Sequence, residues 1–556
     1  MHKFLFAIAL GALSACGHGE ESEEETFTEP SLELTTPTQA AWLPAGPSDV
    51  TGKAIGLDDV TLDGEPVTVA PDGSFTASRN FPRGMSSFEV KGFDERGDHH
   101  YLRRTVIAGD FDEPGQLLEN AAYLRVNRSG LDQLMGIVEG MMADIDLGKK
   151  ASAANPVYED SYGVFGWDAV TIMADVTDVR AGAISVEAVP ASGVLELTAV
   201  LPALELDVLA YGDIIGIDFD TEAWFWADSA VVTGMLTTDV EDGNIVVELH
   251  NPAIDLIGFG YDTSLIPGDV EEYLFVESIE EYLEDSVVEM ITEMVPDMVE
   301  DLLGSVDLSF EADLLGNTVS IEAAFASATI DLEGLQLVVD MTVDLPGTGS
   351  QTFAGYLSTG DVMPDLDRSA HVSAAIADNL MNYALFEAWS AGLLDMRMST
   401  DDGSLDSFML APLRAEEGTI TTAASLPPVI LEDAGELLAQ IGGLGIAIET
   451  PGGEMGENMT LDVTAELNIA VEIDGSDVAL LLGTPEVGLM VTDNDWGASN
   501  EALTQLVTEM LPIEMLLLLL PDMTFPIPEI DGLSIATAEV QRDQSGAFTE
   551  IVLFLQ

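Results

Sequence analysis

Cysteine is almost absent from this sequence, and the single one stands at position 16. A chain with one thiol forms no internal disulfide, so packing alone has to hold the fold together. No apolar run reaches the roughly 20 residues that a helix needs to cross a bilayer. Catalytic signatures are missing as well, since the sequence contains neither a Gly-x-Ser-x-Gly elbow nor a His-Glu-x-x-His pair. We therefore expect a protein that is not an enzyme and that carries no cofactor and no metal.

Basic residues are scarce, with 17 Lys and Arg against 100 Asp and Glu and a net charge of −83. Phosphate contacts require Lys and Arg, so nucleic acid is excluded as a partner. A bare anionic membrane surface should repel the chain for the same reason. The carboxylates are typical of a salt-rich source, where ions screen their repulsion, and a specific cation-binding role is the alternative. The hydrophobic fraction of 47% excludes a disordered chain.

The first residues follow the pattern of a secretory signal. His2 and Lys3 precede a short apolar run over residues 4–13, and the sequence LSAC then ends at Cys16. This ending resembles a lipobox. The resemblance implies cleavage after residue 15 and a lipid anchor on Cys16 whose acyl chains include palmitate. Gly17 indicates the outer membrane, with the periplasmic or surface face left open. An ordinary cleaved signal with a chance cysteine is the alternative.

Two segments separate this signal from the main part of the chain. Residues 16–32 are rich in Glu and should form an extended acidic tether. Residues 33–110 alternate apolar and polar residues, with strands expected at 67–69 and 87–90, turns at Asp63-Gly64 and similar pairs, and His99-His100 in a loop. This order resembles bacterial immunoglobulin-like modules, which implies a small β-sandwich that serves as a spacer or an attachment module.

Beyond residue 116 the sequence predicts two halves that each combine long helices with long strands. In the first half, Ser129 should cap a helix, and a second helix should run from Ser278 to a stop at Gly304, kinked or split at Pro296. Their apolar stripes consist of Leu131, Leu134, Val138 and Met142 on the first helix, and of Val287, Ile291, Met294, Met298 and Leu302 on the second.

The second half repeats this plan. A helix is expected over residues 370–391, with Ile376, Leu380 and Tyr383 on one side. Strands should fill residues 396–490, and a last helix, with Leu506 and Met510, should cover 500–520.

Four stretches in this order are similar to the family of bactericidal/permeability-increasing protein, lipopolysaccharide-binding protein and the plasma lipid-transfer proteins, of the tubular lipid-binding superfamily. They are residues 123–132, 278–303, 378–394 and 511–533. The resemblance implies an α+β boomerang of two helix-wrapped antiparallel halves, 117–350 and 360–556, joined by a central sheet. It also implies an apolar tunnel for lipid tails in each half and no catalytic residues.

Two features depart from that family. The disulfide of its animal members cannot form here, and the first half lacks the basic tip of the members that bind lipopolysaccharide. The second departure argues against direct recognition of lipid phosphates by charge.

The residues themselves also indicate an apolar cavity. Methionine is plentiful on the predicted helices, and its flexible side chain suits a cavity with exchangeable contents. We therefore take the stripe residues named above as candidate contacts for the acyl chains of a phospholipid or another acyl lipid, carried or presented by the anchored protein. The alternative is a surface scaffold whose immunoglobulin-like module mediates attachment and which holds no exchangeable lipid.

Overall fold

The computed structural model describes residues 29–555, apart from residues 116, 144, 165–166, 215, 264–268, 307–308, 315–316, 346–353, 361, 454–455, 475–476, 509–523, 528–533 and 544–545. Cys16 and most of the predicted tether lie outside this range. Contacts divide the chain into two compact units. Among the described residues, the smaller unit comprises 29–38, 48–79 and 88–104, and the larger unit comprises 39–47, 80–87 and the chain from 105 onward.

The N-terminal strands form two sheets. One contains β1 (Ser31–Thr36), β3 (Gly46–Ile55) and β6 (Ser74–Phe81), and the other has the order β2 (Trp42–Leu43), β8 (His99–Ala108), β7 (Gly84–Phe93), β4 (Asp58–Leu62) and β5 (Glu65–Pro66). Asp63 and Gly64 join β4 to β5 with φ angles of 48° and 84°, as the predicted tight turn requires. Val67–Val69 is not a strand, because only Val69 pairs, through a single bridge to Phe75. His99 begins a strand and is not in a loop.

The larger unit is built around a sheet that takes strands from both predicted halves. Its order is β18 (Phe310–Leu314), β19 (Asn317–Ile330), β20 (Gly334–Asp344), β10 (Leu118–Asn127), β22 (Val372–Ala377), β32 (Phe548–Leu555) and β31 (Ile535–Arg542). At its centre, Tyr123 of β10 pairs with Ala375 of β22, which joins the two halves through backbone hydrogen bonds.

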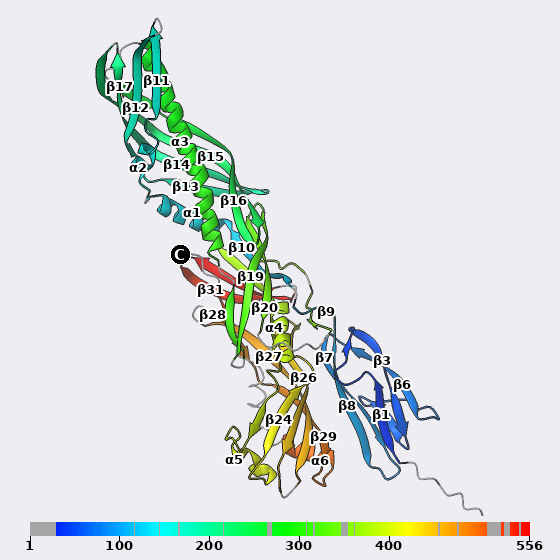
Figure 1. The fold of residues 1–556 in the computed structure, drawn as a ribbon. Coiled ribbons are helices and arrows are strands. Elements are labelled where there is room, and N and C mark those ends of the chain that lie inside the picture. Colours follow the sequence, from blue (N-terminus) through cyan, green and yellow to red (C-terminus); the bar gives the residue numbers. More distant parts are fainter. Residues whose placement is uncertain are drawn as a thin grey trace, which may run out of the picture. The chain divides into compact units, whose positions relative to one another are not determined.

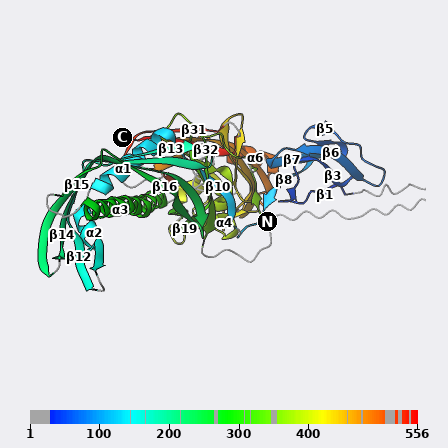
Figure 2. The same ribbon diagram turned by 90° about the horizontal axis from the view of Figure 1, so that it is seen from above.

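A second sheet belongs to the first half. It has the order β11 (Tyr158–Val164), β12 (Trp167–Arg180), β14 (Val194–Ile214), β15 (Ile217–Glu241) and β16 (Asn244–Ile257), with β13 (Ser185–Ala191) on β14 and β17 (Gly260–Thr263) on β15. Helix α3 (Asp269–Gly304) lies along this sheet (Figure 1). Strands β12, β14 and β15 curve past one end of α3 (Figure 2). Helices α1 (Arg128–Ala143) and α2 (Leu147–Ser152) complete this half.

The third sheet belongs to the second half. It has the order β23 (Arg397–Ser399), β24 (Thr419–Ala424), β26 (Glu436–Glu449), β27 (Asn458–Asp474), β28 (Asp477–Leu482) and β30 (Thr524–Pro526), with β25 (Val429–Asp433) on β26 and β29 (Glu486–Asn494) on β27. The other elements here are α4 (Asp378–Ser390), α5 (Ser407–Leu410), the short 3-10 helix Ala411–Leu413, α6 (Asn500–Thr508) and the pair β9 (Phe111–Asp112) and β21 (Tyr356–Leu357). The predicted α+β class is therefore confirmed, with curled antiparallel sheets.

Three helix predictions need correction. Residues 372–377 of the predicted helix 370–391 form strand β22, because β10 and β32 supply hydrogen-bond partners on both sides. Helix α3 starts at Asp269 and not at Ser278, and it continues through Pro296 without splitting. Burial of the side chains around Pro296 offsets the lost hydrogen bond. The last helix is described only to Thr508, so Met510 lies outside the described residues.

Candidate functional site

The apolar stripes predicted on α1 and α3 meet in one hydrophobic cluster of the first half. Its members include Leu131, Leu134, Val138, Met142, Val287, Ile291 and Leu302, all buried, and Met294 and Met298 pack against it while partly exposed. The sheet contributes alternating residues such as Leu195 and Leu197 of β14, because every second side chain points to the helices. Sequence reasoning thus identified a common core, but not which part of it is hollow.

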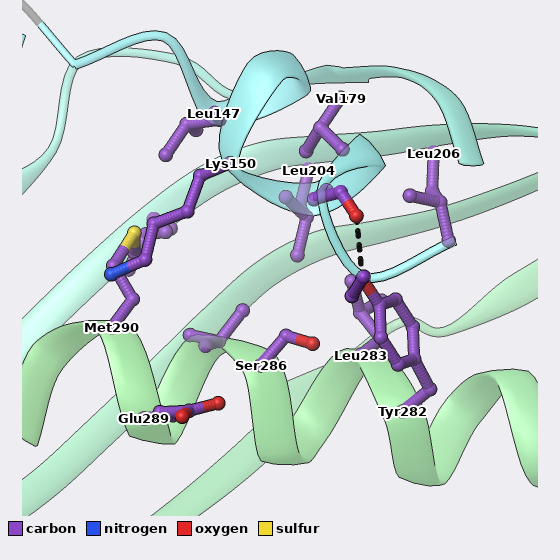
Figure 3. Close-up of a pocket in the computed structure, with 14 residues that line it drawn as sticks. Leu147, Lys150, Val179, Leu204, Leu206, Tyr282, Leu283, Ser286, Glu289 and Met290 are labelled. Carbon is purple, nitrogen blue, oxygen red and sulfur yellow. Dashed lines mark hydrogen bonds between the residues drawn. The ribbon is translucent and has the colours of Figure 1, made fainter. Parts of the chain in front are cut away.

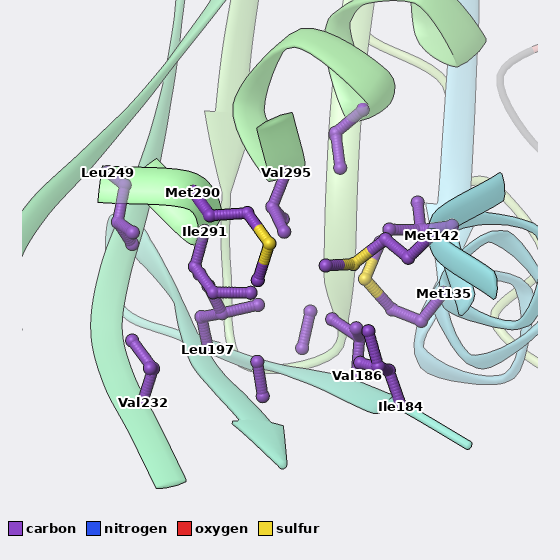
Figure 4. Packing of buried hydrophobic residues seen from close by; sticks show 14 of the residues in the cluster. Met135, Met142, Ile184, Val186, Leu197, Val232, Leu249, Met290, Ile291 and Val295 are labelled. Carbon is purple, nitrogen blue, oxygen red and sulfur yellow. The ribbon is translucent and has the colours of Figure 1, made fainter. Parts of the chain in front are cut away.

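Methionine side chains fill the middle of this cluster. Met135 and Met142 come from α1 and Met290 comes from α3, and all three extend into the space above the sheet (Figure 4). Their unbranched thioethers pack with little steric constraint, so this region can adapt when a neighbouring space is filled.

A hollow of about 150 Å³ lies beside this core, between β14, α2 and α3. Its apolar wall consists of Leu201, Leu204 and Leu206 on β14, Val179 on β12, Leu283, Val287 and Met290 on α3, and Leu147, Ala151 and Ala154 on and after α2. Polar groups stand among them at Lys150, Tyr282, Ser286 and Glu289 (Figure 3). Apolar walls with a few polar groups are typical of a site for an amphiphilic small molecule.

Helix α2 covers this hollow and is fixed firmly to β12. Gly148 allows the close approach, since a Cβ there would lie 3.2 Å from the Asp178 Oδ1 atom. After the helix, the Asn155 side chain donates to the Val176 carbonyl at 2.9 Å and accepts from the Val176 N–H at 2.7 Å. These two bonds have the same donor and acceptor pattern as the backbone hydrogen bonds between paired strands. They hold one side of α2 on the sheet.

The contacts of α2 with α3 are fewer and more exposed. The Tyr282 hydroxyl donates to the Ala151 carbonyl at 3.3 Å (Figure 3), and Lys150 Nζ lies 3.3 Å from Glu293 Oε2. Both side chains of that ion pair are about half exposed, so it contributes at most about 1 kcal/mol. Helix α2 therefore resembles a lid that is anchored on β12 and only lightly held on α3.

The surface of α3 near the lid is strongly acidic. Burial, together with the neighbouring carboxylates of Glu280 and Asp285, raises the pKa of Glu284. Glu289 and Glu293 lie one and two turns further along the helix. Lys150 thus faces a helix surface that carries carboxylates.

The residues predicted to line a second hollow lie in two neighbouring clusters. Leu380 and Tyr383 are buried in a cluster with the central sheet. Leu506 packs against another cluster of the second half, and Ile376 packs against both.

A hollow of about 420 Å³ does exist elsewhere in the second half, between β26, β27 and β31. Its apolar residues include Leu437, Ile469 and Val540, but Glu436, Asn468, Gln541 and Arg542 also line it. This polar lining fits an acyl chain less well than the hollow beneath α2 does.

Most of the lining beneath α2 was not predicted. Of the candidate lipid contacts named from the sequence, only Val287 lines the hollow, although Leu283 on the same predicted helix face lines it as well. The missed wall on β14 has only an interrupted signal, because the alternation of its leucines changes phase between Leu201 and Leu204, at Ala203 with its φ of 50°. Helix α2 has no buried residue and so no stripe by which a sequence pattern reveals it.

Among the described residues, no group of three or more His, Cys, Asp or Glu side chains is arranged to hold a metal ion. Within the same part of the chain, no helix combines the length and the apolar character needed to cross a membrane. His250 lies inside β16, and His371 accepts a hydrogen bond at Nδ1 from the Leu555 N–H.

No protein-family model and no curated protein matches this sequence. Among solved structures, the chain is similar to a crystal structure of lipopolysaccharide binding protein, with 14% identity and a TM-score of 0.43 over 80% of this chain and 99% of that one. It is also similar to P47 from Clostridium botulinum A2, with 10% identity and a TM-score of 0.31 over 79% of this chain and 98% of that one. Both TM-scores lie below 0.5, so the functional conclusion has to come from the geometry of this chain itself.

Proposed function

We propose that this protein is a lipid-anchored lipoprotein of the outer membrane that binds acyl chains in the hollow beneath α2, for lipid carriage or presentation and without catalysis. The observation that supports this most directly is the leucine-lined space of about 150 Å³ between β14 and α3. A space of this kind is costly in a protein that has no use for it, because cavities reduce stability.

The size of the hollow sets the strength of binding. A cavity of about 150 Å³ is large enough for a benzene ring, which corresponds to roughly six carbons. At about 0.8 kcal/mol per buried methylene, such a segment gains at most about 5 kcal/mol relative to water. In a bilayer the acyl chain is already removed from water, so its transfer between the bilayer and the hollow changes the free energy little. Binding of this strength suits exchange more than storage.

Filling the hollow from its rim should weaken binding strongly. Ala154 lines the hollow and is exposed, so Ala154→Phe places a ring in the space without disturbing the core. We expect the affinity for decanoate, measured by calorimetry, to fall at least about tenfold, since a phenyl group displaces two or more methylenes. Ala153→Phe is the matched control, because Ala153 is exposed but does not line the hollow. Equal affinity in both variants would show that the chain binds elsewhere.

The anchor is tested separately. Cys16→Ser removes the thiol that the lipid requires, and we expect the protein to move from the membrane fraction to the soluble fraction on ultracentrifugation. Gly17→Ser, next to it, leaves the thiol in place and should stay with the membranes. Retention of Cys16→Ser on the membranes contradicts the lipobox interpretation.

The rival function is a surface scaffold in which the N-terminal strands mediate attachment. Native mass spectrometry of the Cys16→Ser chain distinguishes the two. Bound lipid, or uptake of added lipid, supports carriage, whereas an empty protein that ignores added lipid supports the scaffold.

A further inference from the structure

The hollow beneath α2 carries a single ammonium group among its lining residues, and that group belongs to the lid. We infer that the hollow takes a single-chain amphiphile with an anionic head, a carboxylate or a phosphate, and that Lys150 binds the head by itself, in place of the basic tip that the first half lacks. This inference rests on the proposed function, because it assigns the ligand class of the same site.

The volume selects one chain. A space of about 150 Å³ holds roughly six carbons, so a second acyl chain of a diacyl lipid has no room beside the first. The rest of a longer single chain, or its head, must lie at the rim. Of the polar lining residues, Lys150 and Glu289 are exposed and Tyr282 and Ser286 are partly exposed, so they are the ones such a head would meet.

Lys150 has the geometry of a head-binding residue. Its aliphatic stem lies along the hollow and its ammonium reaches the rim, in the manner of long side chains at apolar surfaces (Figure 3). An ammonium has three N–H donors, and Glu293 Oε2 accepts at 3.3 Å. Because that ion pair is half exposed and weak, an acceptor oxygen of a ligand head can replace Glu293 or join it.

Glu289 and Glu293 are the competing groups, since a cationic head would pair with them. Carboxylates cover this protein, with 100 Asp and Glu in the chain, so a cation gains little at this rim that it does not gain elsewhere. An anionic head, by contrast, meets few cations on this protein. After Lys150 the sequence contains five basic residues: Arg180, Arg368, Arg397, Arg414 and Arg542. The preference for an anion therefore rests on the direct contact with the Lys150 ammonium, which has to outweigh the net negative charge around it.

The test compares probes of equal chain length and different heads on the Cys16→Ser chain: decanoate, decyl phosphate, decanol and decyltrimethylammonium. We expect one or both anions to bind at least about fivefold more tightly than decanol, and also more tightly than the cation. The difference between decanoate and decyl phosphate shows which anionic head the rim prefers.

Three substitutions then assign the head contact. Lys150→Glu should lower the affinity for the preferred anion about tenfold and leave decanol almost unchanged. Glu293→Gln should raise the anion's affinity about two- to fivefold, because it removes the internal competitor of Lys150. Lys149→Glu makes the same charge change on the same helix outside the hollow, so it should stay within about twofold of the parent.

The outcomes separate the two claims. If no probe binds, the proposed function itself fails. If all four probes bind equally, or if the cation binds most tightly, the hollow holds a chain but the anionic head is wrong. If Lys149→Glu and Lys150→Glu lower the anion's affinity equally, only long-range charge acts and Lys150 does not contact the head.

Discussion

Replacing Arg542 with alanine is expected to lower the free energy of unfolding by about 3–5 kcal/mol. The Arg542 guanidinium binds the Asp378 carboxylate through two hydrogen bonds, from Nη1 to Oδ1 at 2.8 Å and from Nη2 to Oδ2 at 2.6 Å. The Asp378 side chain is fully buried at the start of α4, so its charge would be left without a counter-ion and away from water. The shift of the urea midpoint, followed by circular dichroism, measures the loss.

The matched control is Arg368→Ala. Arg368 also pairs with a carboxylate, that of Glu333, but both side chains are more than half exposed. We expect this change to cost less than about 1 kcal/mol, because water replaces the lost partner. Similar losses in both variants would mean that burial of Asp378 does not govern the energy of its ion pair.

Acid should relieve the defect in Arg542→Ala. Burial raises the pKa of Asp378, and in the parent the guanidinium opposes this effect. Without Arg542 only the effects that raise the pKa of Asp378 remain. The Asp378 carboxyl of the folded state then keeps its proton at a pH where the same carboxyl in the unfolded state, with a pKa of about 3.9, has lost it. The contribution of Asp378 to the stability of the variant is then complete below about pH 4 and is lost as the pH rises through the raised pKa of the folded state. The difference from the parent should therefore shrink on acidification, which urea titrations at about pH 7 and about pH 4.5 measure.

The long amphipathic helices could be predicted because their apolar spacing reflects a single face. Leu131, Leu134 and Val138 repeat every three or four residues on α1, and the structure buries all three. The same rule failed at residues 372–377, where Val372 and Ile376 also stand four apart. The alanines between them favour a helix, and the partners that decide for a strand, β10 and β32, are far away in the sequence.

The site was harder to predict than the fold. A stripe of apolar residues shows that a surface is buried, but it does not distinguish a filled interior from a hollow one, since both exclude water equally. Val287 and Ile291 stand one turn apart on the same stripe and belong to the same cluster, yet only Val287 lines the hollow. The lid is short and has no buried side chain, and the wall on β14 depends on the irregular Ala203. Such features follow from tertiary packing and leave no periodic signal.

Helix α4 gives the second large prediction, because it is buried nearly all round and carries polar side chains inward. Asn382 is 1% exposed; its Nδ2 donates to the carbonyls of Leu357 at 3.1 Å and Ile430 at 2.9 Å, and its Oδ1 accepts from the Ile430 N–H at 2.6 Å. This one amide therefore ties α4 to β21 and to β25, and Asn382→Ala leaves their backbone groups without a partner.

We expect Asn382→Ala to lower the free energy of unfolding by about 3–5 kcal/mol, since each buried group left unsatisfied costs about 1–3 kcal/mol. Asn468→Ala is the control, because the Asn468 amide is exposed and bonds only to the exposed Glu436 carboxylate at 3.0 Å; it should stay within about 0.5 kcal/mol of the parent. Asn382→Asp keeps the shape and the acceptor but loses both N–H donors and adds a buried charge, so at neutral pH it should be less stable than Asn382→Ala. Urea midpoints in the order parent, Asn382→Ala, Asn382→Asp would show that hydrogen bonding, and not side-chain volume, makes this position essential. The reverse order of the two variants would show that packing dominates.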